Sequence, residues 1–126
     1  MANPPDIINV AHIYGEEQQT RLDVITSLDI MDAVPTNYTH KVNTIIVANI
    51  DGANNCDVNI AIDKNGTLRY LAYTITIPAD SALSLIDTPI YISHNASGTG
   101  NKLVAFAQTA DDLDVTVSWE AITDVA

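Results

Sequence analysis

Basic side chains are scarce in this sequence of 126 residues, and their scarcity excludes several kinds of partner. Five Lys and Arg face sixteen Asp and Glu, which gives a formal net charge of -11 at pH 7. Binding to a phosphate backbone or to an anionic membrane surface depends on clustered cations. The cations here are instead scattered along the chain: Arg21, Lys41, Lys64, Arg69 and Lys102. We therefore expect no nucleic-acid partner and no membrane partner.

Disulfides and long apolar runs are missing as well. Cys56 is the single cysteine, so no disulfide can form within the chain. The stretch from Met1 to Pro5 has neither the basic nor the apolar segment of a signal peptide. No apolar run approaches the ~18 residues that would predict a membrane-spanning helix. These absences lead us to expect a protein that is made and folded in a reducing cytosol.

Alternation of apolar and polar residues is the main pattern that is present. It is clearest near the end of the chain, where every second residue from Leu113 to Ala121 is apolar. A period of two is typical of a strand with one buried and one solvated face. Similar segments recur with short turns between them, so the sequence predicts an all-β domain. The expected strands span residues 7–13, 22–34, 41–50, 57–63, 67–77, 82–86, 89–93, 102–108 and 113–122.

Turn residues divide these strands. Asn65 and Gly66 can both take positive φ, which predicts a tight antiparallel hairpin at this point. The polar stretch from Gly15 to Gln19 is expected to interrupt the first part of the sheet. Segment 22–34 also fits a helix in part, but its β-branched residues and the following Pro35 favour a strand.

About eight or nine strands with short turns predict an antiparallel two-sheet β-sandwich of jelly-roll or Greek-key type. Residues 1–6 contain two prolines, which cannot join a central sheet, so we expect them to form an N-terminal arm. Residues 7–126 are expected to form a single β-sandwich domain.

No pattern of catalytic residues is present. His12, His40 and His94 are far apart and belong to no metal-ligand motif. The Gly-x-Ser-x-Gly motif of a nucleophile elbow is missing, and the Gly-rich segment 97–100 lacks the pattern that binds phosphate. We therefore expect a protein that is not an enzyme, with no catalytic residue and no cofactor.

A cluster of oxygen-bearing residues leaves calcium binding open as an alternative. Its members follow or end the strand expected at 41–50: Asn49, Asp51, Asn54, Asn55 and Asp57. Their spacing does not match the calcium loop of an EF-hand, and the bidentate Glu is missing. Ordinary turn chemistry of Asp and Asn explains the cluster better.

The few aromatic residues argue against a sugar-binding site. Tyr70 and Tyr73 would fall on opposite faces of a regular strand, so without a bulge they cannot form one aromatic platform. Trp119 shares the apolar face of the last strand and is expected in the core.

Three stretches resemble small virion proteins of tailed bacteriophages: "HKVNTIIVANIDGANNCDVNIAI", "YTITIPADSALSLIDTPIYI" and "KLVAFAQTADDLDVTVSWEAI". The resemblance covers residues 40–122. It implies a β-sandwich part that coats or connects the particle, most simply a capsid cement or decoration protein that stabilises the shell. It further implies a location in the virion after synthesis in the host cytoplasm. The implied partners are the major capsid protein or other virion proteins, and no catalytic residue is implied.

The strand expected at 41–50 is apolar on both faces, with Val42 and Ile46 on one face and Ile45 and Val47 on the other. Such a strand is either central or covered by a partner. We expect Ile45 and Val47 to form an oligomer or docking surface, with a homotrimer favoured, and Val47→Asp to dissociate it while leaving the fold intact. The alternative is that both residues lie in the core of one chain.

Other functions remain open beside capsid cement. Within the virion, a neck or tail adaptor protein would use a similar sandwich. A carbohydrate-binding, adhesin-like module would need an exposed aromatic or calcium site. A small enzyme of the cupin type would need a cluster of histidines and carboxylates.

Overall fold

The structure is a computed structural model that describes residues 10–94 and 100–124. The described ranges contain nine strands and no helix, and therefore no helix that could span a membrane. The expected arm at residues 1–6 and most of segment 97–100 lie outside them. The strands are β1 (Val10–Arg21), β2 (Leu28–Met31), β3 (Tyr38–Asn49), β4 (Cys56–Lys64), β5 (Thr67–Ile77), β6 (Ala82–Ser84), β7 (Ile90–Ser93), β8 (Lys102–Ala107) and β9 (Leu113–Asp124).

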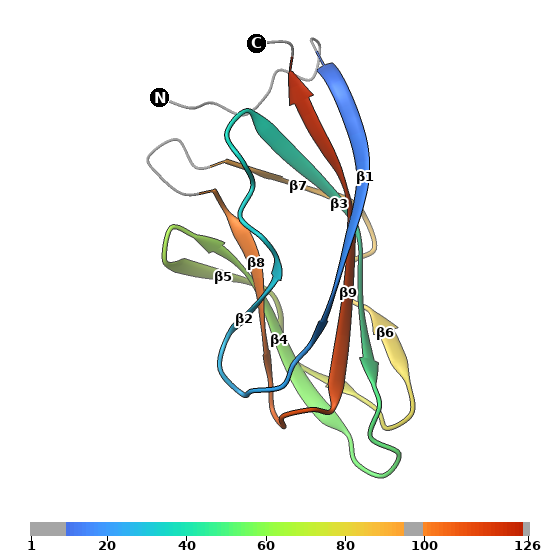
Figure 1. The fold of residues 1–126 in the computed structure, drawn as a ribbon. Helices are drawn as coiled ribbons and strands as arrows, with labels where there is room; N and C mark the ends of the chain where they lie inside the picture. Colours follow the sequence, from blue (N-terminus) through green and yellow to red (C-terminus); the bar gives the residue numbers. More distant parts are fainter. Residues whose placement is uncertain (1–9, 95–99, 125–126) are drawn as a thin grey trace.

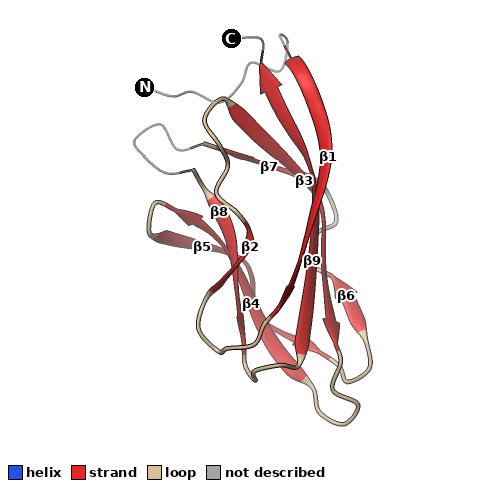
Figure 2. Ribbon diagram, viewed as in Figure 1, coloured by secondary structure: helices blue, strands red, loops and turns tan. Residues whose placement is uncertain are grey.

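The strands form two antiparallel sheets that pack face to face (Figures 1 and 2). One sheet has the order β1-β9-β3-β6, with β7 also paired to β3. The other sheet has the order β2-β8-β4-β5. The expected all-β, antiparallel two-sheet sandwich is confirmed.

The chain is wound as one long nested hairpin. β4 pairs with β5 beside the central turn, β3 pairs with β6 and β7, β2 pairs with β8, and β1 pairs with β9. The hairpin is then rolled, so that β9 also pairs with β3 and β8 with β4. This rolled hairpin is the jelly-roll winding, one of the two types that the sequence left open.

The hairpin turns at the position that the sequence predicts. Asn65 has a φ of 54° and Gly66 a φ of 93°, as a type I′ turn requires. The backbone N–H of Gly66 donates to Asp63 Oδ1 at 2.7 Å, which fixes the turn. Residues Lys64 and Thr67 face each other across it as the first pair of the ladder.

The predicted break at Gly15–Gln19 is wrong. β1 runs through these residues and stays paired with β9 from Ile13 to Arg21 without a shift in register. β1 is an edge strand, and most of its described side chains are exposed. Polar residues therefore cost little there, because backbone hydrogen bonds to β9 do not depend on side-chain polarity.

Segment 22–34 forms a strand only over β2, which is shorter than predicted. Leu22 is fully buried, and its backbone N–H donates to the carbonyl of Leu113 at 2.9 Å. The residues from Asp23 to Ser27 are exposed and cross from one sheet to the other. A segment that crosses between two sheets cannot stay hydrogen-bonded to a neighbouring strand. The alternation of apolar and polar residues in this segment therefore does not form one long strand.

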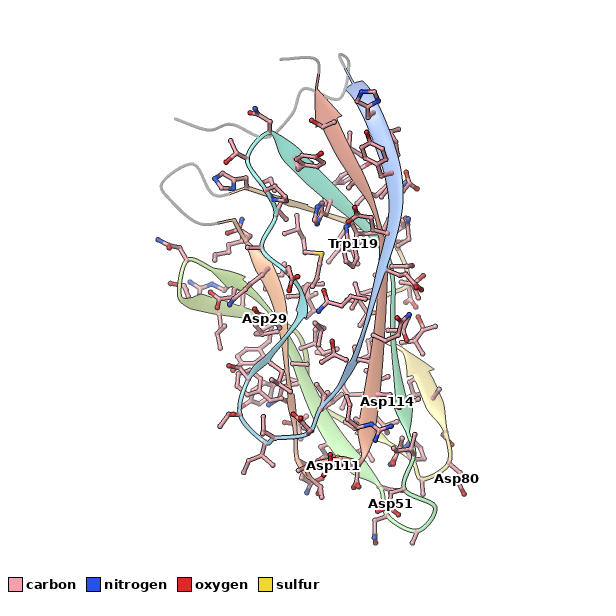
Figure 3. All side chains as sticks on the ribbon, in the orientation of Figure 1. Asp29, Asp51, Asp80, Asp111, Asp114 and Trp119 are labelled. Atoms are coloured by element: carbon pink, nitrogen blue, oxygen red, sulfur yellow. The ribbon has the colours of Figure 1, made fainter. Side chains whose placement is uncertain are left out.

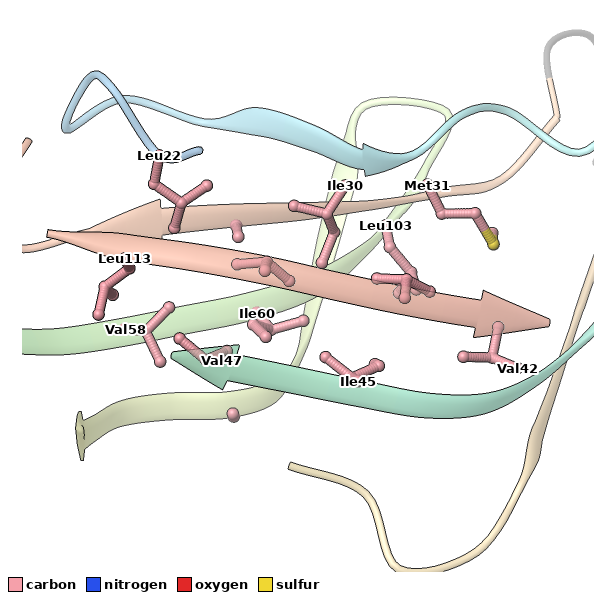
Figure 4. Packing of buried hydrophobic residues seen from close by; sticks show 14 of the residues in the cluster. Leu22, Ile30, Met31, Val42, Ile45, Val47, Val58, Ile60, Leu103 and Leu113 are labelled. Atoms are coloured by element: carbon pink, nitrogen blue, oxygen red, sulfur yellow. The ribbon is translucent and has the colours of Figure 1, made fainter. Parts of the chain in front are cut away.

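The core fills the space between the two sheets with aliphatic side chains (Figure 4). Burying each such side chain contributes roughly 1.5–3 kcal/mol to stability before entropy is counted. Trp119 is 6% exposed and joins this cluster, as predicted. The largest fully buried members are Leu22, Ile30, Met31, Ile45, Ile60, Ile77, Leu103 and Leu113.

Candidate functional site

Ile45 and Val47, the residues expected at a docking surface, lie inside a single chain. Both are 0% exposed, and they pair with Val117 and Val115 of β9 on the core side of the sheet. This is the alternative that the sequence left open. The outward side chain between them is Ile46, which is 38% exposed. A partner that docks on this part of β3 can therefore reach Ile46, whereas Ile45 and Val47 are out of its reach.

An open pocket lies between the middle of β1 and the segment that connects β2 to β3. Glu16 of β1 pairs with Trp119 of β9, and Gln18 pairs with Val117. Because paired residues share a face and Trp119 and Val117 point into the core, Glu16 and Gln18 point to the same side. The segment from Asp32 to Pro35, between β2 and β3, forms the opposite wall.

This hollow, called the acidic pocket below, has a volume of about 650 Å³. That size is within the range of small-molecule and side-chain binding sites. Figure 3 places Trp119 in this half of the sandwich, beside β1 and β9. The lining residues are Glu16, Glu17, Gln18, Asp32, Ala33, Pro35, Tyr38, His40, Trp119 and Ala121.

Aromatic rings form the inner part of the acidic pocket. His40 stacks on Trp119 with ring centroids 5.3 Å apart and an angle of 25° between the planes. Tyr38 meets His40 edge to face at 6.4 Å. His40 and Trp119 are 5% and 6% exposed, and among the described residues His40 Nδ1 and Trp119 Nε1 have no hydrogen-bond partner. Two buried polar atoms thus remain unsatisfied beside the pocket.

The charged side chains that line the acidic pocket are all carboxylates. Glu16, Glu17 and Asp32 are exposed at its rim, and among the described residues no Lys or Arg lines it. Burial lowers the pKa of His40 to about 4, so its ring is neutral at neutral pH. The pocket therefore attracts cations and repels anions.

The cluster of Asp and Asn residues after β3 is a hydrogen-bonded turn. Asn49 Oδ1 accepts from the N–H of Asp51 at 2.9 Å, and Asp51 Oδ1 accepts from the N–H groups of Ala53 and Asn54. These backbone donors lower the pKa of Asp51. Among the described residues, no group of three or more His, Cys, Asp or Glu is placed to hold a metal ion. Turn chemistry accounts for the cluster.

The expectation that Tyr70 and Tyr73 lie on opposite faces is wrong for this strand. The β4–β5 ladder shifts register next to Ile60, and Thr74 has a φ of 53°. These irregularities bring the two rings together, edge to face, with centroids 4.9 Å apart. The side chains are 45% and 65% exposed, so β5 carries an exposed aromatic pair.

The three histidines have separate neighbours. His12 stacks on Tyr14, His40 stacks on Trp119, and His94 Nδ1 lies 2.9 Å from the carbonyl of Val34.

Sequence reasoning missed the acidic pocket. The pocket could have been predicted only from the register of β1 against β9, which sets Glu16 opposite Trp119. The sequence alone does not fix that register.

Comparison with solved structures shows a likeness of fold alone. Neither the known protein families nor the curated proteins give a match to this sequence. A subunit of T=1 particles derived from infectious bursal virus is similar, with a TM-score of 0.51, 9% identity, 90% of this chain and 32% of that chain covered. This chain therefore spans about a third of that subunit.

Two further solved structures are similar at lower scores. One is the virus-like particle of the extra small virus of the prawn Macrobrachium rosenbergii, with a TM-score of 0.46 and 12% identity. The match covers 98% of this chain and 85% of that chain. Another is a pentameric capsid protein from metagenomic phage sequences, with a TM-score of 0.42 and 15% identity. The match covers 96% of this chain and 64% of that chain. Proteins outside viral capsids also match, with TM-scores of 0.46 and 0.39.

Proposed function

We propose that this protein is a non-enzymatic structural component of a virus particle. The particular role we propose is a capsid cement or decoration protein of a tailed bacteriophage, made in the host cytoplasm and bound to the major capsid protein in the virion. The observation that carries the proposal is the jelly-roll winding of this chain, together with its likeness in fold to a subunit of bursal-virus particles. The sequence resemblance over residues 40–122 supports the choice of phage and of decoration.

The surface charge suits a part that is present in many copies on a shell. A net charge of -11 suppresses non-specific association at high local concentration. Two of the edge strands, β2 and β6, are only four and three residues long. Short edge strands limit unwanted pairing between copies.

The proposed homotrimer would use the outward side of β3 and its neighbours. Ile46 is 38% exposed and Tyr91 of β7 is 57% exposed. These side chains belong to strands that are paired with one another, so a partner chain could cover them together. Exposed apolar side chains on one sheet are typical of association sites.

Light scattering of the purified protein tests the trimer. We expect a mass three times the 13.5 kDa of the chain, and a monomer of unchanged circular dichroism for Ile46→Asp. Ile25→Asp is the matched control, because Ile25 is 62% exposed in the loop between β1 and β2. A persistent trimer in Ile46→Asp would contradict the interface, and a monomeric wild type would contradict the trimer.

Co-sedimentation tests the partner. The protein is mixed with capsids of the phage whose genome encodes it, prepared without this protein. A decoration protein should bind in many copies over the whole shell, whereas a neck or tail adaptor should bind at one vertex or to tails only. Absence of binding to both capsids and tails would contradict a virion role.

A second function, that of a carbohydrate-binding adhesin-like module, is favoured by one observation. Tyr70 and Tyr73 form an exposed aromatic pair, and aromatic rings are the usual contact surface for sugars. A glycan array probed with wild type and with Tyr73→Ala separates the two functions. Binding that disappears in Tyr73→Ala would favour the module, and an array without any signal would favour the structural role.

A further inference from the structure

The acidic pocket plays no part in the proposed docking on β3, and it has the features of a ligand site. Its carboxylates and its aromatic rings line one hollow, and the unsatisfied nitrogens of His40 and Trp119 are buried in the wall of that hollow. We propose that the acidic pocket binds an organic cation, an ammonium or guanidinium group, carried by a basic side chain of a partner protein.

The carboxylates select a cation. Glu16 reaches the pocket from β1 and Asp32 from the connection between β2 and β3, so two separate elements present negative charge to one space. Neither carboxylate has a salt-bridge partner among the described residues, where the ion pairs are Arg21–Asp114 and Lys102–Asp29. A bound guanidinium or ammonium would supply the missing counter-charge.

The aromatic rings favour an organic cation over a metal ion. Tyr38 is half-buried and lines the pocket, and the face of a phenol ring attracts an ammonium or guanidinium group. Among the described residues, no group of three or more metal-ligating side chains is present. A hollow of about 650 Å³ also exceeds the needs of a bare ion and has room for a long side chain with part of its backbone.

The unsatisfied nitrogen of Trp119 lies within the wall of the pocket, so an acceptor of the ligand reaches it only when the indole ring shifts. Trp119 is 6% exposed, and its Nε1–H, a donor only, has no acceptor among the described residues. Buried donors of this kind are rare unless a ligand or a water satisfies them. A peptide residue such as Arg or Lys carries a cation and a backbone carbonyl together, whereas a free ammonium ion carries no acceptor.

Trp119 is the single tryptophan of the chain, so its fluorescence reports directly on the pocket. The protein is titrated with N-acetyl-arginine methylamide, and with N-acetyl-citrulline methylamide as a neutral probe of nearly the same shape. We expect a saturable change with the arginine probe, with a Kd on the order of millimolar, and none with the citrulline probe. Calorimetry provides a second measurement that does not depend on fluorescence.

Matched variants locate the interaction. Glu16→Gln and Asp32→Asn should each weaken binding of the arginine probe about fivefold, which corresponds to the loss of one partly exposed ion pair. Glu120→Gln is the control, since Glu120 neighbours Trp119 on β9 but accepts a hydrogen bond from Asn43 at 3.2 Å and does not line the pocket. Circular dichroism checks that each variant is folded.

The outcomes are distinct. Equal responses to the arginine and citrulline probes, or no response to either, would overturn the proposal. Binding of guanidinium or tetramethylammonium ions as tight as that of the arginine probe would overturn the assignment to a partner's side chain and assign the pocket to a small free cation. These titrations use the isolated protein, so their result is independent of the capsid test.

Discussion

Asn49 shows how one buried polar side chain holds a turn. It is 3% exposed, its Nδ2 donates to the carbonyls of Ile77 at 2.9 Å and Asn54 at 3.0 Å, and its Oδ1 accepts from Asp51. One side chain thus ties the end of β3 to the end of β5. The same residue that suggested a calcium ligand in the sequence is a structural hydrogen-bonding centre.

Asn49→Ala should destabilise the protein by about 2 kcal/mol, because it leaves the buried carbonyl of Ile77 without its donor and removes two further hydrogen bonds. Urea unfolding, followed by circular dichroism, measures the loss. Asn43→Ala is the control: Asn43 lies on the same strand, but it is exposed and donates to Glu120 at the surface. Equal losses for the two variants would show that the buried network contributes nothing.

His40 makes stability depend on pH. Its pKa is about 4 in the folded chain and near 6.5 in the unfolded chain, because burial disfavours the charged ring. Between these values the unfolded chain binds more protons, so the free energy of unfolding rises with pH. The contribution is fully present above pH 6.5 and is lost as the pH falls toward 4.

His40→Phe should remove this dependence while keeping a ring against Trp119. The difference between wild type and variant should change by on the order of 2 kcal/mol between about pH 7 and pH 4.5. Urea unfolding at each pH gives the two curves, and carboxylates that titrate in both proteins cancel in the difference. His12→Phe, at an exposed position of β1, should follow the wild type. Parallel curves for wild type and His40→Phe would contradict the low pKa.

At the scale of elements, the β4–β5 hairpin is the innermost and most local part of the nested winding. Among the described strands, β4 and β5 are the only paired strands that are consecutive in the chain, whereas β1 and β9 meet from opposite ends of the chain. Local contacts lose less chain entropy on closing, so the hairpin is favoured to form early in folding.

Gly66→Ala should cost about 1–2 kcal/mol and slow folding, because a φ of 93° strains any residue with a Cβ. No atom lies within 4 Å of the added Cβ, so the cost belongs to the backbone alone. Stopped-flow refolding and unfolding in urea give the folding rate and the free energy of unfolding. Gly15→Ala in β1 also has nothing within 4 Å and should be neutral or slightly stabilising. A change confined to the unfolding rate would place the turn late in folding.

At the scale of the whole molecule, the two sheets decide which face of β3 is the inside. Val47→Ala should cost about 2 kcal/mol, since Val47 is 0% exposed, whereas Ile46→Ala should cost less than about 1 kcal/mol. Val47→Asp would place an unpaired charge in the core and should unfold the protein. Ile46→Asp, and not Val47→Asp, is therefore the variant that can dissociate an oligomer without unfolding the chain. Denaturant unfolding of the two alanine variants checks the assignment, and equal costs would contradict it.

Much of the fold could be predicted because it depends on short-range patterns. Thr67–Ile77 has the predicted bounds, and the Asn65-Gly66 turn lies where its φ preferences require. The predictions failed where the chain leaves the regular period. The irregular β4–β5 ladder brought Tyr70 and Tyr73 to one face, and pairing with β9 carried β1 through its polar residues. Neither effect can be recognised from the order of the residues alone.

The sequence by itself determined most of the strands, the central turn, the acidic balance and the all-β class, because each follows from residues that are neighbours along the chain. Only the tertiary structure decided that Ile45 and Val47 face inward and that Glu16, Asp32, His40 and Trp119 surround one pocket. Those relations depend on register and on the rolling of the hairpin, which bring together residues far apart in sequence. Burial of the shared apolar face selects that arrangement, and it is a property of both sheets at once.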